Sequence, residues 1–124
     1  MGQKSELYPV GTNLYQGLLF PYLNKVYNNK GELVDYNSIV SCEDYLEVDD
    51  TYTYEKSYRI YGLVMYDSQY NVIGFWSQNS LSVTTIPIAQ GTKYIRVSIL
   101  GSYINSSGYI PEKELATRYI KRIA

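Results

Sequence analysis

Apolar and polar residues alternate in short runs along most of the chain, with the two-residue period of a β-strand. The cleanest run covers residues 92–100, where Ile95, Val97 and Ile99 alternate with polar positions. The longest apolar run covers residues 58–66. This pattern favours strands over helices in most of the chain.

Turn residues separate these runs. Residues 28–31 (Asn-Asn-Lys-Gly) join runs at 23–27 and 32–36, which predicts a β-hairpin. Further strands are expected at residues 13–20, 38–42, 45–48, 51–57, 72–76 and 81–86. About eight to nine short antiparallel strands, with no helical period before residue 109, predict an all-β sandwich or barrel.

The pattern changes from Pro111 onward. Acidic residues come first and basic residues last, as a helix dipole favours. The apolar residues of this segment fall on one helical stripe and are Leu115, Tyr119, Ile120 and Ile123. The segment predicts a short C-terminal helix, and a final edge strand at residues 118–123 is the alternative. The predicted organisation is a lead-in at 1–12, a sandwich at 13–108 and a helical tail at 109–124.

The apolar stripe of this tail has two interpretations. It folds back on its own sandwich, or it packs on a second copy or a neighbouring domain. Because the stripe is narrow and its flanks are charged, we expect contacts beyond the sandwich, as in a homo-oligomer such as a trimer.

Composition argues against catalysis. The chain has no histidine, and its one cysteine, Cys42, precedes two acidic residues that would raise the pKa of the thiol. A disulfide within the chain and a cysteine-based zinc site are excluded. The other acidic residues cluster at turns, so a catalytic carboxylate pair or a calcium site is the lesser alternative. We predict no enzyme activity, no catalytic residue, no metal and no cofactor.

Charge and hydropathy exclude two further classes of partner. Eleven basic and twelve acidic residues nearly cancel, and no block of like charge stands out, so neither nucleic acid nor an anionic membrane surface is expected. No apolar run approaches the roughly 20 residues of a membrane span. The first six residues lack the apolar stretch of a signal peptide.

Tyrosine dominates the aromatic residues, with 16 tyrosines beside two phenylalanines and one tryptophan. A tyrosine ring offers an apolar face and a hydroxyl, which suits the recognition of polar rings such as sugars. Tyrosine is also a good strand former, and this is the structural alternative.

A sugar site needs an exposed aromatic platform with planar polar groups beside it. Trp76 ends a predicted strand, where it acts either as a stacking platform or as a plug of the core. Arg59 and Tyr61 share one face of their predicted strand, and Tyr94 and Arg96 share one face of theirs, so the four would form one patch if both strands lie in the same sheet. Tyr103 adds a ring from the loop after the clearest strand. The candidate carbohydrate-binding residues are Trp76, Arg59, Tyr61, Tyr94, Arg96 and Tyr103. The alternative is that both arginines are solvated or paired with Glu47 or Glu55.

Several segments are similar to those of a known family. They are residues 44–48 (DYLEV), 51–54 (TYTY), 64–73 (VMYDSQYNVI), 85–88 (TIPI) and 91–98 (GTKYIRVS). Over roughly residues 13–100 the chain resembles a jelly-roll, carbohydrate-binding-like module of phage tail and baseplate adhesion proteins and of gut-bacterial surface proteins. Asp49 and Asp50 stand where the family often has a glycine.

The resemblance implies a jelly-roll β-sandwich that binds a glycan or a cell-surface polysaccharide in host adhesion. It also implies a place in the virion, on a phage tail beside a neighbouring tail protein, or at the cell surface or outside the cell. Two other functions stay open. One is a structural or oligomerisation module of a baseplate or fibre, and the other is an accessory domain of a larger secreted enzyme.

Overall fold

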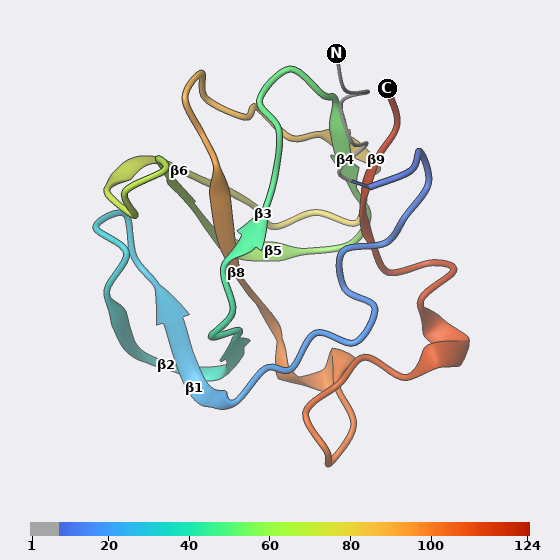
Figure 1. The fold of residues 1–124 in the computed structure, drawn as a ribbon. Coiled ribbons are helices and arrows are strands. Elements are labelled where there is room, and N and C mark those ends of the chain that lie inside the picture. The colour runs from blue at the N-terminus through green and yellow to red at the C-terminus, as the bar shows by residue number, and fades with distance from the viewer. Residues whose placement is uncertain (1–7) are drawn as a thin grey trace.

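The computed structural model describes residues 8–124, which form nine strands in two antiparallel sheets (Figure 1). The strands are β1 (Tyr22–Tyr27), β2 (Leu33–Ser41), β3 (Leu46–Glu47), β4 (Tyr54–Lys56), β5 (Ile60–Tyr66), β6 (Val72–Gln78), β7 (Thr84–Thr85), β8 (Tyr94–Leu100) and β9 (Ile120–Arg122). The six-stranded sheet has the order β1-β2-β8-β5-β6, with β3 also on β8, and the smaller sheet has the order β7-β4-β9. The prediction of an all-β sandwich of eight to nine antiparallel strands is confirmed.

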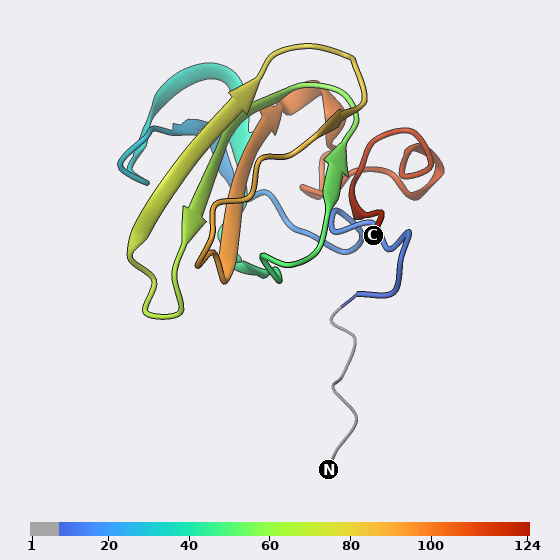
Figure 2. The same cartoon turned by 90° about the horizontal axis from the view of Figure 1, so that it is seen from above.

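The main core lies between the two sheets. Figure 2 shows β6, β5 and β8 side by side in one layer, with β4 beyond them on the side of the C-terminus. The alternating face predicted for β8 is confirmed, because its three aliphatic residues point into this core. The fully enclosed residues of the main core are Phe20, Cys42, Tyr54, Ile60, Leu63, Ile95, Val97, Ile99 and Ile120.

The strand expected at residues 13–20 is absent, and this prediction is wrong. The segment forms one isolated bridge, from Asn13 to Lys121, and then turns at Gly17, whose φ is 70°. The segment is a loop with tight turns, and its apolar side chains are buried in the main core. The first seven residues of the predicted lead-in lie outside the described part of the chain.

The prediction of a C-terminal helix is also wrong, and the alternative prediction of a final edge strand is confirmed. Only a three-residue 3-10 helix forms, at Glu112–Glu114, and the chain then runs as β9 along β4. The Asn13 side chain donates to the carbonyls of Leu115 and Arg118 at 3.0 and 2.9 Å. Because β4 offers an unpaired edge and a short helix is marginal by itself, strand pairing prevails.

The tail therefore belongs to the sandwich. Ile120 is fully buried in the main core, and Leu115 packs against that core. Ile123 is 37 % exposed. Most of the stripe on which we based the expectation of a homo-oligomer is thus covered by the domain itself.

A second, smaller core lies on the opposite face of the larger sheet, where β1 and β2 curl over β5 and β8. It consists of Tyr27, Val64 and Tyr66, with Phe75 and Tyr94 packed against it. The Tyr27 amide donates to the Ser98 hydroxyl at 2.9 Å, which fastens β1 onto β8. The curl gives the larger sheet two buried faces over part of its area.

The close approach of β1 requires glycine at position 62. A Cβ added to Gly62 would lie 2.7 Å from the Tyr27 carbonyl oxygen, which is a backbone atom. We expect Gly62→Ala to lower the free energy of unfolding by about 1–3 kcal/mol in chemical denaturation, because β1 must move away.

Gly74→Ala on the neighbouring strand is the matched control. The nearest atom there is the flexible Met65 Sδ, at 3.1 Å. Because a methionine side chain can reorient, we expect a loss below about 1 kcal/mol. Equal denaturation midpoints for the two variants would contradict the close packing of β1 on β5.

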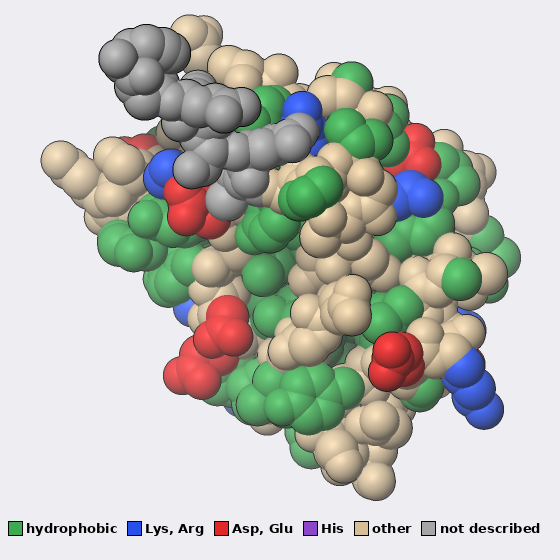
Figure 3. All heavy atoms as spheres, turned by 45° about the vertical axis from the view of Figure 1, so that its right-hand side comes forward, with side chains coloured by type: hydrophobic (Ala, Val, Ile, Leu, Met, Phe, Trp, Pro, Cys, Tyr) green, Lys and Arg blue, Asp and Glu red, His purple; other side chains and the backbone are tan. Residues whose placement is uncertain are grey.

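Charged side chains do not gather into one region on the face shown in Figure 3, where acidic and basic groups are scattered among hydrophobic and neutral polar ones. Within residues 8–124, no helix has both the length and the apolar character that a membrane span demands.

Candidate functional site

Two of the six residues selected from the sequence, Tyr94 and Arg96, lie together on the outer face of β8, the face turned away from the main core. In the pairing of β8 with β5, Tyr94 lies opposite Tyr66 and Arg96 opposite Val64. Both partners belong to the second core. The sequence prediction that Tyr94 and Arg96 share a face is therefore confirmed.

Trp76 and Arg59 lie apart from this pair. Trp76 is paired with Leu63, so its indole is on the core side of the larger sheet and packs against the main core. The Arg59 guanidinium donates to the backbone carbonyl and to the side-chain oxygen of Asn79, at 2.9 and 2.8 Å. The arginine partners expected from the sequence, Glu47 and Glu55, are not the ones found.

Tyr61 and Tyr103 are separate as well. The Tyr61 ring packs against Tyr36 of β2, with the ring centroids 6.2 Å apart. Tyr103, expected in a loop, lies instead in a 3-10 helix at Gly101–Tyr103 and is buried. Its ring meets Tyr58 edge-on at 5.6 Å, and the Arg118 guanidinium lies 4.7 Å from the ring centre. The six residues therefore do not form one patch.

Around Tyr94, the structure assembles a cluster that the sequence did not indicate. The rings of Tyr70 and Tyr94 are stacked, with centroids 4.7 Å apart and 10° between their planes. Tyr45 meets them edge-on, at 4.8 Å from Tyr70 and 6.1 Å from Tyr94. Tyr70 is 51 % exposed and Tyr45 38 % exposed. We call Tyr45, Tyr70 and Tyr94 the tyrosine platform.

A rigid turn between β5 and β6 presents Tyr70. The Asp67 carboxylate accepts the backbone N–H groups of Gln69 and Asn71, both at 2.9 Å. Tyr70 itself adopts a left-handed backbone conformation with a φ of 65°. Because such a conformation is unfavourable for a bulky residue, the turn must hold it in place.

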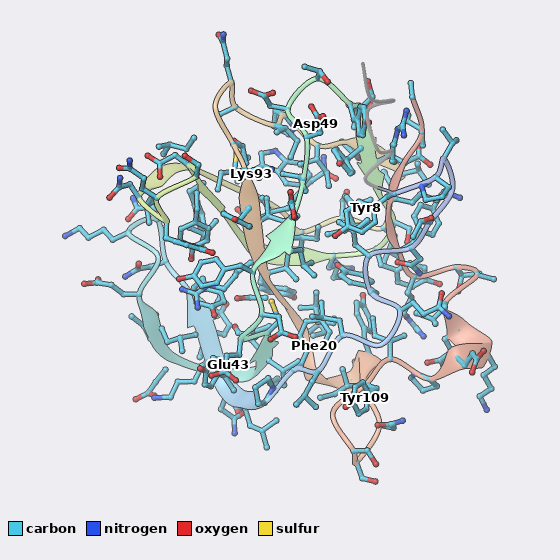
Figure 4. All side chains as sticks on the ribbon, viewed as in Figure 1. Tyr8, Phe20, Glu43, Asp49, Lys93 and Tyr109 are labelled. Atoms are coloured by element: carbon cyan, nitrogen blue, oxygen red, sulfur yellow. The ribbon has the colours of Figure 1, made fainter. Side chains whose placement is uncertain are left out.

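The pairing of β3 with β8 brings Tyr45 to the same place. Leu46 lies opposite Ile95, and Glu47 lies opposite Tyr94. Glu47 also forms an ion pair with Lys93, at 2.6 Å. Lys93 directly precedes β8 and lies at the upper end of that strand in Figure 4, so this ion pair borders the platform.

Arg96 supports the platform from the side of the second core. Its guanidinium carbon lies 4.1 Å from the ring centre of Tyr45, 4.8 Å from that of Tyr27 and 5.2 Å from that of Tyr66. Its Nε donates to the Tyr66 hydroxyl at 3.0 Å. No carboxylate in residues 8–124 forms an ion pair with Arg96. Ring faces therefore stabilise this cation and, in return, the cation fixes Tyr45.

The Tyr70 phenol of the platform is neutral near pH 7. The pKa of Tyr70 is raised above its ordinary value, first by its hydrogen bond with Tyr94 and then by the charge repulsion between the two groups. Tyr70 thus presents a hydroxyl that can donate or accept a hydrogen bond.

Three of the acidic groups expected at turns form hydrogen bonds or an ion pair with neighbouring groups. The Asp49 carboxylate accepts from the amide of Thr51 at 2.9 Å and from its hydroxyl at 2.6 Å. The Asp50 carboxylate accepts the Gly91 amide, and Glu114 forms an ion pair with Arg118. Across residues 8–124, no three His, Cys, Asp or Glu side chains converge as a metal site would require.

Cys42 is fully buried. Burial raises the pKa of its thiol to about 12, although the backbone N–H of Val97 and the charge of Arg96 act in the opposite direction. The sulfur accepts the Val97 amide at 3.3 Å. A thiol of this kind is not a nucleophile near neutral pH.

Comparisons of the chain with protein-family models, with curated proteins and with solved structures give no significant match. Functional inference therefore rests on the geometry of the tyrosine platform and on the residues around it.

Proposed function

We propose that the protein is a non-catalytic carbohydrate-binding domain whose ligand stacks on the tyrosine platform. The observation that carries this proposal is the stacked pair Tyr70 and Tyr94, in which Tyr70 is half exposed and Tyr94 is partly buried, with Tyr45 packed edge-on against both rings. A sugar ring has an apolar C–H face, and an exposed aromatic ring is its natural partner.

Polar groups at the border of the platform suit the hydroxyl rim of a sugar. The phenol hydroxyls both donate and accept hydrogen bonds, and the ion pair of Lys93 and Glu47 is itself almost half exposed, with side-chain exposures of 44 % and 43 %. Because these groups are held by turns and strand pairing, little conformational entropy is lost when a ligand binds.

The platform is a surface feature, so a single saccharide would bury little area and bind weakly. Several copies on one particle or one cell surface would raise the overall affinity through multivalency. This suits host adhesion by a phage tail or a bacterial surface protein. That setting, and the jelly-roll form of the sandwich, are supported by the sequence resemblance.

We expect Tyr70→Ala to weaken saccharide binding at least about thirtyfold, the loss of roughly 2 kcal/mol typical of a stacking anchor. Stability should fall by no more than about 1 kcal/mol, because Tyr70 is half exposed and loses only ring contacts. Affinity electrophoresis of the full chain through gels of soluble bacterial surface polysaccharides and glucans measures binding, and thermal melting measures stability.

Tyr36→Ala is the matched control, since Tyr36 is 52 % exposed and lies outside the platform on β2. It should bind as the unmodified chain does. If Tyr36→Ala and Tyr70→Ala weaken binding equally, or if no polysaccharide retards the unmodified chain, the proposal fails.

A further inference from the structure

Two hollows lie on either side of the turn formed by residues 105–109, at the end of the sandwich away from the tyrosine platform. The first, of about 380 Å³, is lined on its apolar side by Leu23, Val40 and Ile104. The second, of about 350 Å³, is lined by Tyr109, Ile110 and Leu115, among others. Hollows of this size lie within the range of small-ligand sites, roughly 300–1,000 Å³.

The strand β8 separates these hollows from the platform. Tyr94 begins β8, and Gly101, which lines the first hollow, directly follows its last residue. Seven residues of strand at about 3.3 Å each place the two regions roughly 20 Å apart. In Figure 4, Lys93 lies at the upper end of β8 and Tyr109 lies below the lower end of that strand.

The polar lining is almost entirely neutral. In the first hollow it consists of Asn24, Ser38, Asn105 and Ser106, with no charged residue. The second hollow adds Gln16 and shares Asn105, and its one charged residue is Glu112. No basic side chain lines either hollow, so an anionic ligand would have no counter-charge. The lining favours a neutral ligand with many hydroxyls.

Asn105, the residue common to both hollows, is held in one orientation. Its side-chain oxygen accepts the backbone amides of Ser107 at 3.0 Å and Tyr109 at 3.1 Å. Both bonds use Oδ1, and Nδ2 of this amide forms no hydrogen bond within residues 8–124. Its two N–H donors remain for a ligand.

Asn24 is arranged in the same way. It lies where the pairing of β1 with β2 is irregular, because residues 36–39 of β2 bulge out opposite it, and it has a left-handed φ of 57°, while Ser38 has a φ of 73°. The Asn24 side-chain oxygen accepts the Ser38 amide at 3.0 Å, and its Nδ2 has no partner in the described chain. Backbone strain of this kind costs free energy and often marks a binding site. Two carboxamide nitrogens are thus preset around one hollow.

We propose that these hollows form a second site, which binds a neutral oligosaccharide with one sugar unit on each side of Asn105. The Nδ2 groups of Asn24 and Asn105 donate to hydroxyl or ring oxygens of the ligand, and Tyr109, 39 % exposed, offers an apolar face to the second unit. None of the residues that line this second site belongs to the tyrosine platform, so the second site does not depend on the platform.

The test is a titration of the ¹⁵N-labelled full chain with maltotetraose, cellotetraose and mannotetraose at millimolar concentration. At least one of these should shift the side-chain amide signals of both Asn24 and Asn105. Asn105→Asp keeps an oxygen for the turn but removes the two donors, and it should weaken that binding about tenfold or more.

Asn28→Asp is the matched control. Asn28 caps the β1–β2 turn through the same kind of bond, since its side-chain oxygen accepts the amides of Lys30 and Glu32, both at 2.9 Å, but its Nδ2 is already bonded to the Glu32 carboxylate at 3.0 Å. It lines neither hollow, so its substitution should leave the binding constant unchanged.

Tyr70→Ala separates the two proposals, because it should leave the shifts of Asn24 and Asn105 intact. Three results would overturn the second site. They are unshifted amides with all three tetrasaccharides, unchanged affinity in Asn105→Asp, and loss of the Asn24 and Asn105 shifts in Tyr70→Ala.

Discussion

Deleting residues 111–124 should unfold the domain. The deletion removes β9, which supplies the pairing for one edge of β4, and it removes the fully buried Ile120 from the main core. Loss of a buried isoleucine side chain alone costs about 2–5 kcal/mol, against a total stability of about 5–15 kcal/mol for a domain. Near-UV circular dichroism and the dispersion of amide signals should both collapse in the truncated chain.

The segment is tied to the rest of the fold by more than Ile120. The Ile120 carbonyl accepts the Leu14 amide at 2.7 Å, and the Ser57 hydroxyl donates to the Thr117 carbonyl at 2.6 Å. These bonds fasten the N-terminal loop and the residue that follows β4 to the C-terminal segment. The segment is therefore a structural part of the sandwich and not an appendage.

Ile120→Ala and Ile123→Ala form a matched pair on β9 and its end. Ile120 is fully buried, whereas Ile123 is 37 % exposed. We expect a loss of about 2–5 kcal/mol for the first and below about 1 kcal/mol for the second, measured by chemical denaturation. A truncated chain with a cooperative transition at the original midpoint would contradict this assignment of the tail.

The strands could be predicted where alternation and turn chemistry agree. Residues 92–100 alternate without a break, and the corresponding strand β8 has its predicted inward face. Residues 13–20 have similar apolar content, but Gly17 turns the chain away, so that pairing with β9 is limited to the single bridge at Asn13. The local pattern of apolar residues shows only how readily a segment can form a strand. Whether the strand forms depends on a free sheet edge with which it can pair.

The tail shows the same effect in the opposite direction. Its charges and apolar spacing resemble those of a helix, yet the free edge of β4 offers hydrogen bonds and a buried position for Ile120. Such a partner lies more than 60 residues away in sequence, so no local pattern contains it. From the sequence, the edge strand could therefore be given only as the alternative to a helix.

The tyrosine platform could be predicted only in part. Tyr94 and Arg96 follow from the period of one strand, but Tyr45 and Tyr70 come from two other segments that β3 and the β5–β6 turn bring to the same end. The sequence showed the 67–71 turn and an excess of tyrosine, and neither specifies which rings meet. Contacts between these rings depend on the order of strands in the sheet, and the sequence alone does not give that order.

Trp76→Ala should lower the free energy of unfolding by about 3 kcal/mol, the lower end of the range for loss of a packed tryptophan. The indole lies opposite Leu63 and packs against the main core, so its removal leaves a void. Saccharide affinity should stay within about twofold, because Trp76 is on the other face of the sheet from Tyr94. Tyr70→Ala should show the reverse, with intact stability and lost binding.

Fluorescence offers an independent measurement, since Trp76 is the one tryptophan of the chain. Its emission should not change when a saccharide binds the tyrosine platform, because the platform and Trp76 lie on opposite faces of the sheet. If Trp76→Ala keeps the original denaturation midpoint and loses saccharide binding, the ligand contacts the core-side face of β6. The tyrosine platform would then not be the sugar site, and of the two interpretations of Trp76 that the sequence allows, the stacking platform would be correct.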